Sequence, residues 1–260
     1  FGFNQSSELV QDVNVRKALQ MAVDNEAINA NFYKGYGSTA LYGTVSQDSK
    51  GWNWPVEEWP DEVKQEYTYN PKRAEELLDA SGYPRRADGY RFKVKLANLE
   101  RYETTYAEIL VSYFDAIGVD SEIAVITEAE AGAAARGPTM KWDLHNSIGY
   151  SWFAPNKDLY CLSNCADGNW PKTQDQRMHD IVAAMKVSAT MEESMSLHRE
   201  ADEKTVREHY AIIKPKSPKF YVSQPWVEGY FGEAGMQRAS RNTFMARLWI
   251  DSGLKEAMGH

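Results

Sequence analysis

The stretch NPKRAEELLDASGYP at residues 70–84, followed by RFKVKL at residues 91–96, decides the fold class of this chain. Asn70 is suited to cap a helix, Pro71 suits its first turn, and Gly82 suits its end. The second segment alternates charged and apolar residues, which predicts a half-buried strand. A helix that leads into a strand is the repeating unit of an α/β domain.

The same alternation extends to both sides of this unit. Upstream, Asp12 or Asn14 is suited to cap a helix that runs to Ala22, and a second helix from Asp24 is stopped at Gly35. Downstream, helices and strands continue to alternate, and no internal repeat is present. The expected elements are a helix over 103–117, a strand through 123–125, a short Ala-rich helix capped by Thr127, a strand over 142–148, and helices over 173–188 and 191–210. This order predicts an α/β fold in which helices flank a mixed sheet.

Composition narrows the functional classes. The 260 residues carry 29 Lys plus Arg and 37 Asp plus Glu, a net charge of −8, which disfavours nucleic acid and anionic lipid as partners. No apolar run approaches the ~20 residues that span a bilayer. The first residues, FGFNQSSELVQDVN, contain no signal-peptide pattern, which fits either a cytoplasmic protein or a processed exported one.

Aromatic residues in irregular segments are the unusual feature of the sequence. The chain has 8 Trp and 15 Tyr, several of them in GWNWP at 51–55 and SWFAP at 151–155. Residues 36–69 are expected to form one long irregular connection, a kind of segment that is often functional. The loop aromatics either cover the edges of the protein's own core or line a ligand cleft, and the pattern leaves both open.

No motif in the sequence specifies catalysis or a bound metal. Nucleophile-elbow, phosphate-loop and His-Glu-x-x-His patterns are missing, and His145 is interpreted as a structural histidine. Cys161 and Cys165 have no further ligand residues near them in sequence, so zinc is not expected. The two cysteines form either a short-loop disulfide or two free thiols. We therefore expect no enzyme activity, no cofactor and no metal.

Several collinear segments carry a family resemblance. They are DVNVRKAL at 12–19, AVDNEAI at 22–28, GYG at 35–37, YNPKRAEELLDASGYP at 69–84, IGV at 117–119, WDL at 142–144 with GY at 149–150, and VEGY at 227–230. In this order they resemble the family 5 solute-binding proteins, the dipeptide-, oligopeptide- and nickel-binding proteins of ABC importers. The matching residues are mostly helix caps, helix stops and core positions, so they report the fold more than the ligand.

The resemblance implies a two-lobed periplasmic-binding-protein-like fold of type II that closes on a solute. Residues 1–213 would be the C-terminal ligand-binding lobe. Residues 214–260 would cross the hinge and pack on an N-terminal lobe that is missing here, so Trp226 and Trp249 would be exposed or repacked. The implied partners are a small solute and an ABC permease, and the implied location is periplasmic or extracellular, with a lipoprotein anchor as one option. The alternatives are a sensor that presents its ligand to a chemoreceptor and, less favoured, an α/β hydrolase.

The ligand is expected to be an oligosaccharide or a peptide. In peptide-binding members an Asp pairs with the peptide's amino group, and Phe153 stands at that place here, which weakens the peptide interpretation. Aromatic platforms instead suit a sugar, and Arg101 could hold a carboxylate or a hydroxyl group or lie free on the surface. The predicted ligand-binding residues are Tyr42, Trp52, Arg101, Tyr102, Trp152 and Phe153.

Overall fold

The structure is a computed structural model of the chain, and it describes residues 1–47, 49–138, 140–146, 171–218, 220, 222–230 and 246–259. The chain divides into two compact units, residues 1–216 and residues 217–260. The first unit contains the four-stranded sheet and most of the helices, and the second is a short two-stranded element with one helix.

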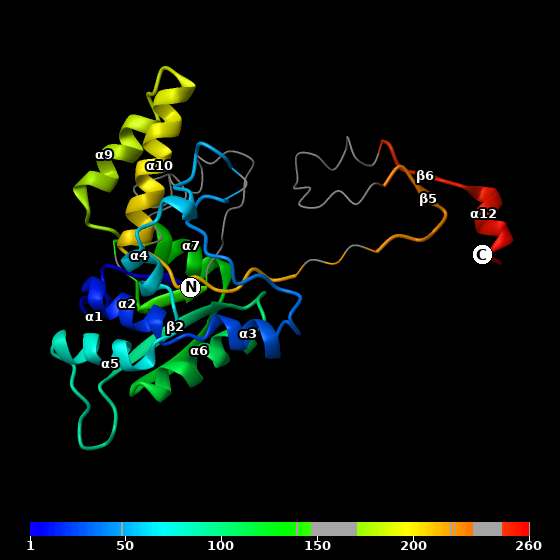
Figure 1. Cartoon of the computed structure of the whole chain (residues 1–260). Helices are drawn as coiled ribbons and strands as arrows, with labels where there is room; N and C mark the ends of the chain where they lie inside the picture. Colours follow the sequence, from blue (N-terminus) through cyan, green and yellow to red (C-terminus); the bar gives the residue numbers. More distant parts are fainter. Residues whose placement is uncertain are drawn as a thin grey trace. The chain divides into compact units, whose positions relative to one another are not determined.

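The first unit alternates helices and strands along the chain, as Figure 1 shows. Its elements are β1 (Gly2–Phe3), α1 (Glu8–Gln11), α2 (Val13–Met21), α3 (Asn25–Asn31), η1 (Val56–Glu58), α4 (Asp61–Glu66), α5 (Pro71–Ala80), β2 (Phe92–Leu99), α6 (Thr105–Ala116), β3 (Val119–Ile126), α7 (Glu128–Arg136), β4 (Leu144–Asn146), α9 (Gln176–Met185) and α10 (Met191–Arg207).

The sheet has the strand order β1-β4-β2-β3 and is mixed. Strand β2 runs parallel to β3, in a register from Phe92 opposite Val119 to Leu99 opposite Ile126. It also runs parallel to β4, whereas β1 pairs with β4 in the antiparallel sense. The prediction of an α/β fold with a mixed sheet flanked by helices is confirmed.

Helices cover both faces of the central strand β2. Val94 and Leu96 point into a cluster with side chains of α2, α5 and α6, whereas Ala97 and Leu99 on the other face pack with α7. Lys93 and Lys95 are exposed near the beginning of the strand. The predicted half-buried pattern therefore describes only the first half of β2, because α7 covers the second half.

The predicted helix caps are present. The Asn70 side chain accepts a hydrogen bond from the Arg73 amide at 3.0 Å and starts α5. Thr127 and Glu130 form a reciprocal capping box on α7, and Thr190 accepts from the Glu193 amide at 3.1 Å at the start of α10. Local sequence specifies these helix ends because each cap satisfies an amide that the helix leaves without a partner.

Residues 36–69 contain more structure than expected. The prediction of one irregular connection is wrong, since this segment includes η1 and α4. Val63 is the only buried residue of α4, so the helix has no apolar stripe for a periodicity argument to detect. Trp54 and Trp59 on either side of η1 are buried and stack with ring centroids 5.4 Å apart. They contribute to the core.

The second unit consists of β5 (Val227–Glu228), β6 (Trp249–Ile250) and α12 (Ser252–Ala257). Strands β5 and β6 are antiparallel, and Asp251 caps α12. Trp249 is 60% exposed, whereas Trp226 is 8% exposed. The expectation of an exposed tryptophan is met at Trp249, and Trp226 follows the repacking alternative. Within the described part of the chain, we find no helix with the length and apolar character needed to cross a bilayer.

Candidate functional site

The carboxyl edge of the sheet is the candidate site of the first unit. Parallel strands β2, β3 and β4 end at Leu99, Ile126 and Asn146, so the chain leaves the sheet on one side at all three points. Ligands of open α/β sheets bind outside the carboxyl ends of the strands. We define this carboxyl edge by the three strand ends and the residues that directly follow or flank them.

Two asparagines tie the strand ends together. The Asn146 side-chain amide donates to Asn98 Oδ1 at 2.9 Å, which joins β4 to β2. Asn98 is fully buried, and its side-chain amide in turn donates to the Tyr102 carbonyl at 2.9 Å. A buried amide with its hydrogen bonds made holds its surroundings in one arrangement. The pair therefore positions the loop that carries Arg101 and Tyr102.

Arg101 and Tyr102 lie in that loop at the carboxyl edge, as the sequence predicts. The Arg101 guanidinium donates to Glu128 Oε1 at 2.7 Å and to the Tyr102 hydroxyl at 3.1 Å. Hydrogen bonding to Tyr102 and the charge of Glu128 raise the pKa of Arg101. Arg101 is thus already paired within the unit, and a ligand group would compete with Glu128 for it.

Tyr42 lies beside Lys214, just after the chain makes its last contact with the four-stranded sheet at Ala211. Its hydroxyl donates to the Lys214 carbonyl at 2.8 Å, and the Lys216 ammonium lies 5.1 Å from its ring centroid. Burial raises the pKa of Tyr42 to about 12, so the hydroxyl remains protonated. Tyr42 is therefore the third predicted residue at the carboxyl edge, although it uses its hydroxyl within the protein.

Trp52 has a different setting, against helix α10. Its ring meets that of His198 edge to face at 4.9 Å, and it packs on the cluster around Val45 and Met178. This contact agrees with the first alternative for the loop aromatics, in which they cover the protein's own core. A role for Trp52 in ligand binding stays a prediction.

A buried carboxylate fixes the loop that bears Trp52. Asp202 on α10 is fully buried and accepts hydrogen bonds from the backbone amides of Val45 and Trp54, both at 2.9 Å. Burial raises the pKa of Asp202 to about 6, and the backbone hydrogen bonds oppose this rise without cancelling it. The loop between Gly43 and Trp54 is therefore held by one titratable group.

The remaining predicted residues lie outside the described part of the chain. Trp152 and Phe153 fall in residues 147–170, as do Cys161 and Cys165. The predictions for the two aromatic residues and the two alternatives for the cysteines stay as the sequence leaves them.

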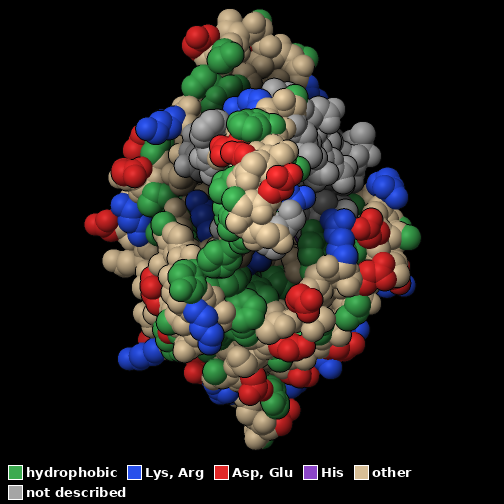
Figure 2. All heavy atoms as spheres, turned by 90° about the vertical axis from the view of Figure 1, so that its right-hand side faces the viewer, with side chains coloured by type: hydrophobic (Ala, Val, Ile, Leu, Met, Phe, Trp, Pro, Cys, Tyr) green, Lys and Arg blue, Asp and Glu red, His purple; other side chains and the backbone are tan. Residues whose placement is uncertain are grey.

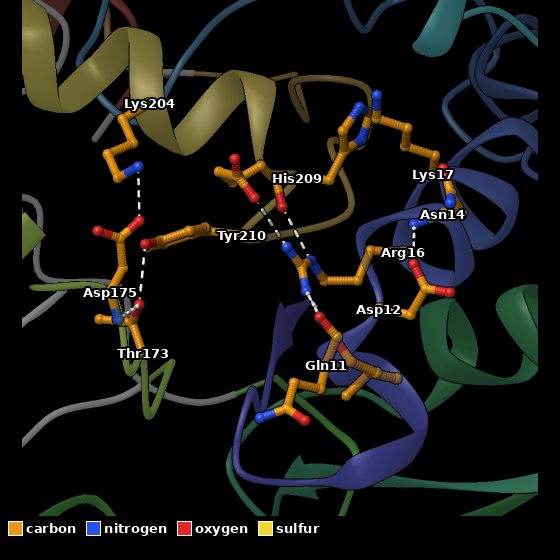
Figure 3. A network of polar contacts seen from close by, with 12 residues as sticks. Gln11, Asp12, Asn14, Arg16, Lys17, Thr173, Asp175, Lys204, His209 and Tyr210 are labelled. Carbon is orange, nitrogen blue, oxygen red and sulfur yellow. Dashed lines mark hydrogen bonds and ion pairs between the residues drawn. The ribbon is translucent and has the colours of Figure 1, made fainter. Parts of the chain in front are cut away.

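The most extensive polar network lies around Arg16, where α2 meets the end of α10 (Figure 3). The Arg16 guanidinium donates to the carbonyls of Val10, Gln11 and Glu208 at 2.8–2.9 Å, and to the Glu208 carboxylate at 3.4 Å. Burial lowers the pKa of Arg16 and Glu208 opposes that shift. Since the backbone and Glu208 occupy the guanidinium, this network supports the fold and offers nothing to a ligand.

A hollow of about 500 Å³ lies between α2, α4 and α5. Lys17 and Glu66 in its wall form an ion pair at 2.5 Å, and Glu66 also accepts from His209 at 3.1 Å. Burial lowers the pKa of His209, which keeps the ring neutral. Because its central charges neutralise one another, this hollow is a weaker candidate than the carboxyl edge.

Hydrophobic and charged side chains are unevenly distributed on the face that Figure 2 shows. In Figure 2, hydrophobic side chains gather near the middle of the lower half of the picture, and charged side chains of both signs lie nearer the outline.

Sequence reasoning did not find four residues of the carboxyl edge: Asn98, Tyr106, Asn146 and Lys214. Asn98 carries a weak signal, since it interrupts the apolar end of β2, where an unpaired amide would be costly. Tyr106 resembles any aromatic residue of an apolar helix face. Lys214 follows a strand-like segment at a Lys-Pro step, and nothing local distinguishes it from a surface lysine.

The comparisons with known proteins identify the family of the chain. Residues 1–170 match the family described as bacterial extracellular solute-binding proteins, family 5 middle. The chain belongs to this family. It is 23% identical over 240 residues to the dipeptide-binding protein of Escherichia coli, and 24% identical over 210 residues to the glutathione-binding protein GsiB of Salmonella typhimurium. The alignments cover 88% and 77% of this chain but only 42% and 38% of those relatives. The resemblance seen in the sequence is confirmed.

Solved structures of family 5 proteins share the fold. The oligopeptide-binding protein AppA of Bacillus subtilis, in complex with a nonapeptide, matches 96% of this chain with a TM-score of 0.71 and 18% identity. NikZ of Campylobacter jejuni, in complex with Ni(L-His), matches 83% with a TM-score of 0.67 and 20% identity. The chain spans 49% and 44% of those two proteins. The periplasmic-binding-protein type of fold is therefore confirmed.

Proposed function

We propose that this chain is part of the substrate-binding component of an ABC importer, which captures a small solute between two lobes and delivers it to a permease. The observation that supports this most is the family match over residues 1–170, which includes the carboxyl edge of the sheet. Residues 1–213 would form the ligand-binding lobe, and residues 214–260 would cross the hinge and pack on an N-terminal lobe. The 60% exposed Trp249 is available for such packing.

The proposed activity is binding without chemical change of the solute. The relatives are named as binding proteins for a dipeptide and for glutathione, and the family is described as extracellular. A periplasmic or extracellular location follows as part of the proposal, with a lipoprotein anchor as one form of it. The proposed ligand is an oligosaccharide or a peptide.

Ligand capture is tested by a thermal-shift screen of the full-length protein against peptides and neutral and acidic oligosaccharides. A ligand that binds only the native state raises the melting temperature with the logarithm of its concentration. We expect at least one probe to do so without being converted, as chromatography of the recovered probe would show. Stabilisation by none of them, or turnover of a bound probe, contradicts the proposal.

The contribution of Trp152 is tested in the same protein with the probe that binds. Loss of an aromatic platform costs about 1–3 kcal/mol, so Trp152→Ala is expected to weaken binding about tenfold or more. Tyr90→Ala is the matched control, because Tyr90 precedes β2 at the end opposite the carboxyl edge. Equal affinities of the wild type and the Trp152 variant would remove Trp152 from the site.

A further inference from the structure

The chain leaves the sheet for the last time at the carboxyl edge. Ala211 bridges Gly2 in the antiparallel sense, and the Ile212 amide donates to the Phe1 carbonyl at 2.8 Å. Since β1 is antiparallel to β4, residues 211–212 run in the direction of β4 and leave the sheet where β4 ends. Lys214 therefore lies at the carboxyl edge, and residues near Phe1 and the start of α6 surround it.

Lys214 carries a half-buried cation that has no carboxylate partner among the residues that the structure describes. Its ammonium nitrogen lies 5.0 Å from the ring centroid of Tyr106. Burial lowers the pKa of Lys214, and no acidic group among the described residues counteracts that shift. A cation–π contact compensates only part of the loss of hydration. The ammonium thus retains donors for an acceptor from outside the lobe.

Tyr106 contributes a second unsatisfied group at the same place. Its side chain is 7% exposed, and its hydroxyl is buried with no hydrogen-bond partner in the described part of the chain. A buried polar group without a partner costs about 1–3 kcal/mol, and native structures contain few of them. Burial, together with the nearby hydroxyls of Tyr33, Tyr42 and Tyr113, raises the pKa of Tyr106 well above its ordinary value. The hydroxyl therefore keeps its proton and can donate it to an anion.

The start of α6 adds a third group of donors. The helix runs for 12 residues from Thr105, and Thr104 at its N-cap makes no side-chain cap hydrogen bond. The Thr104 hydroxyl instead donates to Glu108 Oε1 at 2.8 Å. Thr104 therefore does not cap the first amides of the helix, and the helix dipole favours negative charge near them. The exposed Glu108 carboxylate offsets part of this field from the solvent side.

From these three observations we propose that Lys214, the Tyr106 hydroxyl and the first turn of α6 form a subsite for a carboxylate of the bound solute. One carboxylate would accept from the ammonium and from the hydroxyl and would satisfy both groups at once. The inference rests on the proposed solute-binding function and narrows its substrate class. The ligand is an acidic solute, either a sugar acid or a peptide with a free carboxyl terminus.

The experiment compares probes that differ only in charge, with the full-length protein. The first pair is N-acetyl-trialanine and its C-terminal amide, and the second is trigalacturonate and its methyl ester. Isothermal titration calorimetry gives the dissociation constant of each at low salt and at 0.5 M NaCl. In at least one pair we expect the charged member to bind ten times more tightly than the neutral one, with a difference that shrinks at high salt.

Variants then assign the charge preference to the subsite. Lys214→Met is expected to weaken binding of the charged probe at least tenfold and to leave the neutral probe within twofold. Tyr106→Phe removes only the hydroxyl and is expected to weaken the charged probe about threefold or more. The matched control is Lys95→Met, because Lys95 is exposed near the start of β2 and away from the carboxyl edge; it should leave both constants within twofold.

The outcomes separate the subsite from the function as a whole. If neutral and charged probes bind equally well, or if Lys214→Met leaves the preference intact, the carboxylate subsite is wrong and solute binding stands. If none of the four probes binds while a neutral oligosaccharide from the thermal-shift screen does, the subsite is again wrong. Failure of every probe in both experiments contradicts the proposed function itself.

Discussion

The buried cation Arg16 and the half-buried cation Lys214 have opposite surroundings in this protein. Arg16, with a side chain 3% exposed, donates to three backbone carbonyls and pairs with Glu208. Lys214 has the ring of Tyr106 and no carboxylate among the described residues. Burial lowers the pKa of both groups. Arg16 therefore stabilises the fold of the unit, whereas the Lys214 ammonium is left available.

The difference follows from what each region has to do. The chain segments around Arg16 must be held together permanently, so three of their carbonyl groups and the Glu208 carboxylate accept from the guanidinium. A ligand-binding edge must keep donors unsatisfied until the ligand arrives, and the protein loses some stability in return. Lys214 and the Tyr106 hydroxyl have this property. This contrast has consequences for stability that can be measured without knowledge of the ligand.

The largest expected effect is on Arg16. Arg16→Met removes the guanidinium that donates hydrogen bonds to the carbonyls of Val10, Gln11 and Glu208. It is expected to lower the free energy of unfolding by about 3–5 kcal/mol. Urea denaturation followed by circular dichroism measures this loss. Arg73→Met is the matched control, since Arg73 forms an exposed ion pair with Glu76, and its replacement should cost less than ~0.5 kcal/mol. Similar losses in the two variants would mean that Arg16 does not hold this region together.

A smaller effect is expected from the pH dependence of Asp202, the buried group that fixes the Trp52 loop. Its pKa is about 6 in the folded protein and 3.8 without the protein environment, so the folded state holds the proton more tightly. The contribution of Asp202 to stability is therefore fully present below about pH 4 and is lost as the pH rises through about 6. The loss amounts to about 3 kcal/mol, at about 1.36 kcal/mol for each of the roughly 2.2 pH units between the two pKa values.

Other carboxylates oppose this trend, so the measurement is a difference between two proteins. Urea unfolding of the wild type and of Asp202→Asn at pH 4, 5, 6 and 7 isolates the titration of this one group. The wild type should gain stability relative to the variant as the pH falls. A difference that is constant with pH, or that changes in the opposite direction, would show that the backbone hydrogen bonds to Asp202 outweigh its burial.

The smallest effect is expected for Lys214. Because the ammonium is desolvated without an acidic partner, Lys214→Met should change the free energy of unfolding by less than ~0.5 kcal/mol or increase it slightly. The same urea experiment measures it beside Arg16→Met. A loss of 2 kcal/mol or more would show that Lys214 has a structural role like that of Arg16, and it would remove the contrast between the two regions.

The sequence predicted the framework of the first unit well. Asn70, Thr127 and Thr190 identify the starts of α5, α7 and α10, because a cap acts on amides two or three residues away. The alternation at residues 91–96 identifies β2, and collinear segments identify the family. The sequence missed α4, since only Val63 of that helix is buried, and it missed the cover that α7 provides over the second half of β2.

The candidate site was predicted only in part, because its members come from distant segments of the chain. The sequence by itself determined the fold class, the helix ends and the loop that carries Arg101 and Tyr102, all of which depend on local patterns or on family segments. Three contacts were decided by the tertiary structure alone. Glu128 accepts a hydrogen bond from Arg101, Asp202 accepts from the backbone of the loop that carries Trp52, and the Lys214 ammonium lies over the Tyr106 ring. Burial and the presence or lack of a charged partner depend on neighbours about 27 to 150 residues away in the chain, and no local pattern encodes them.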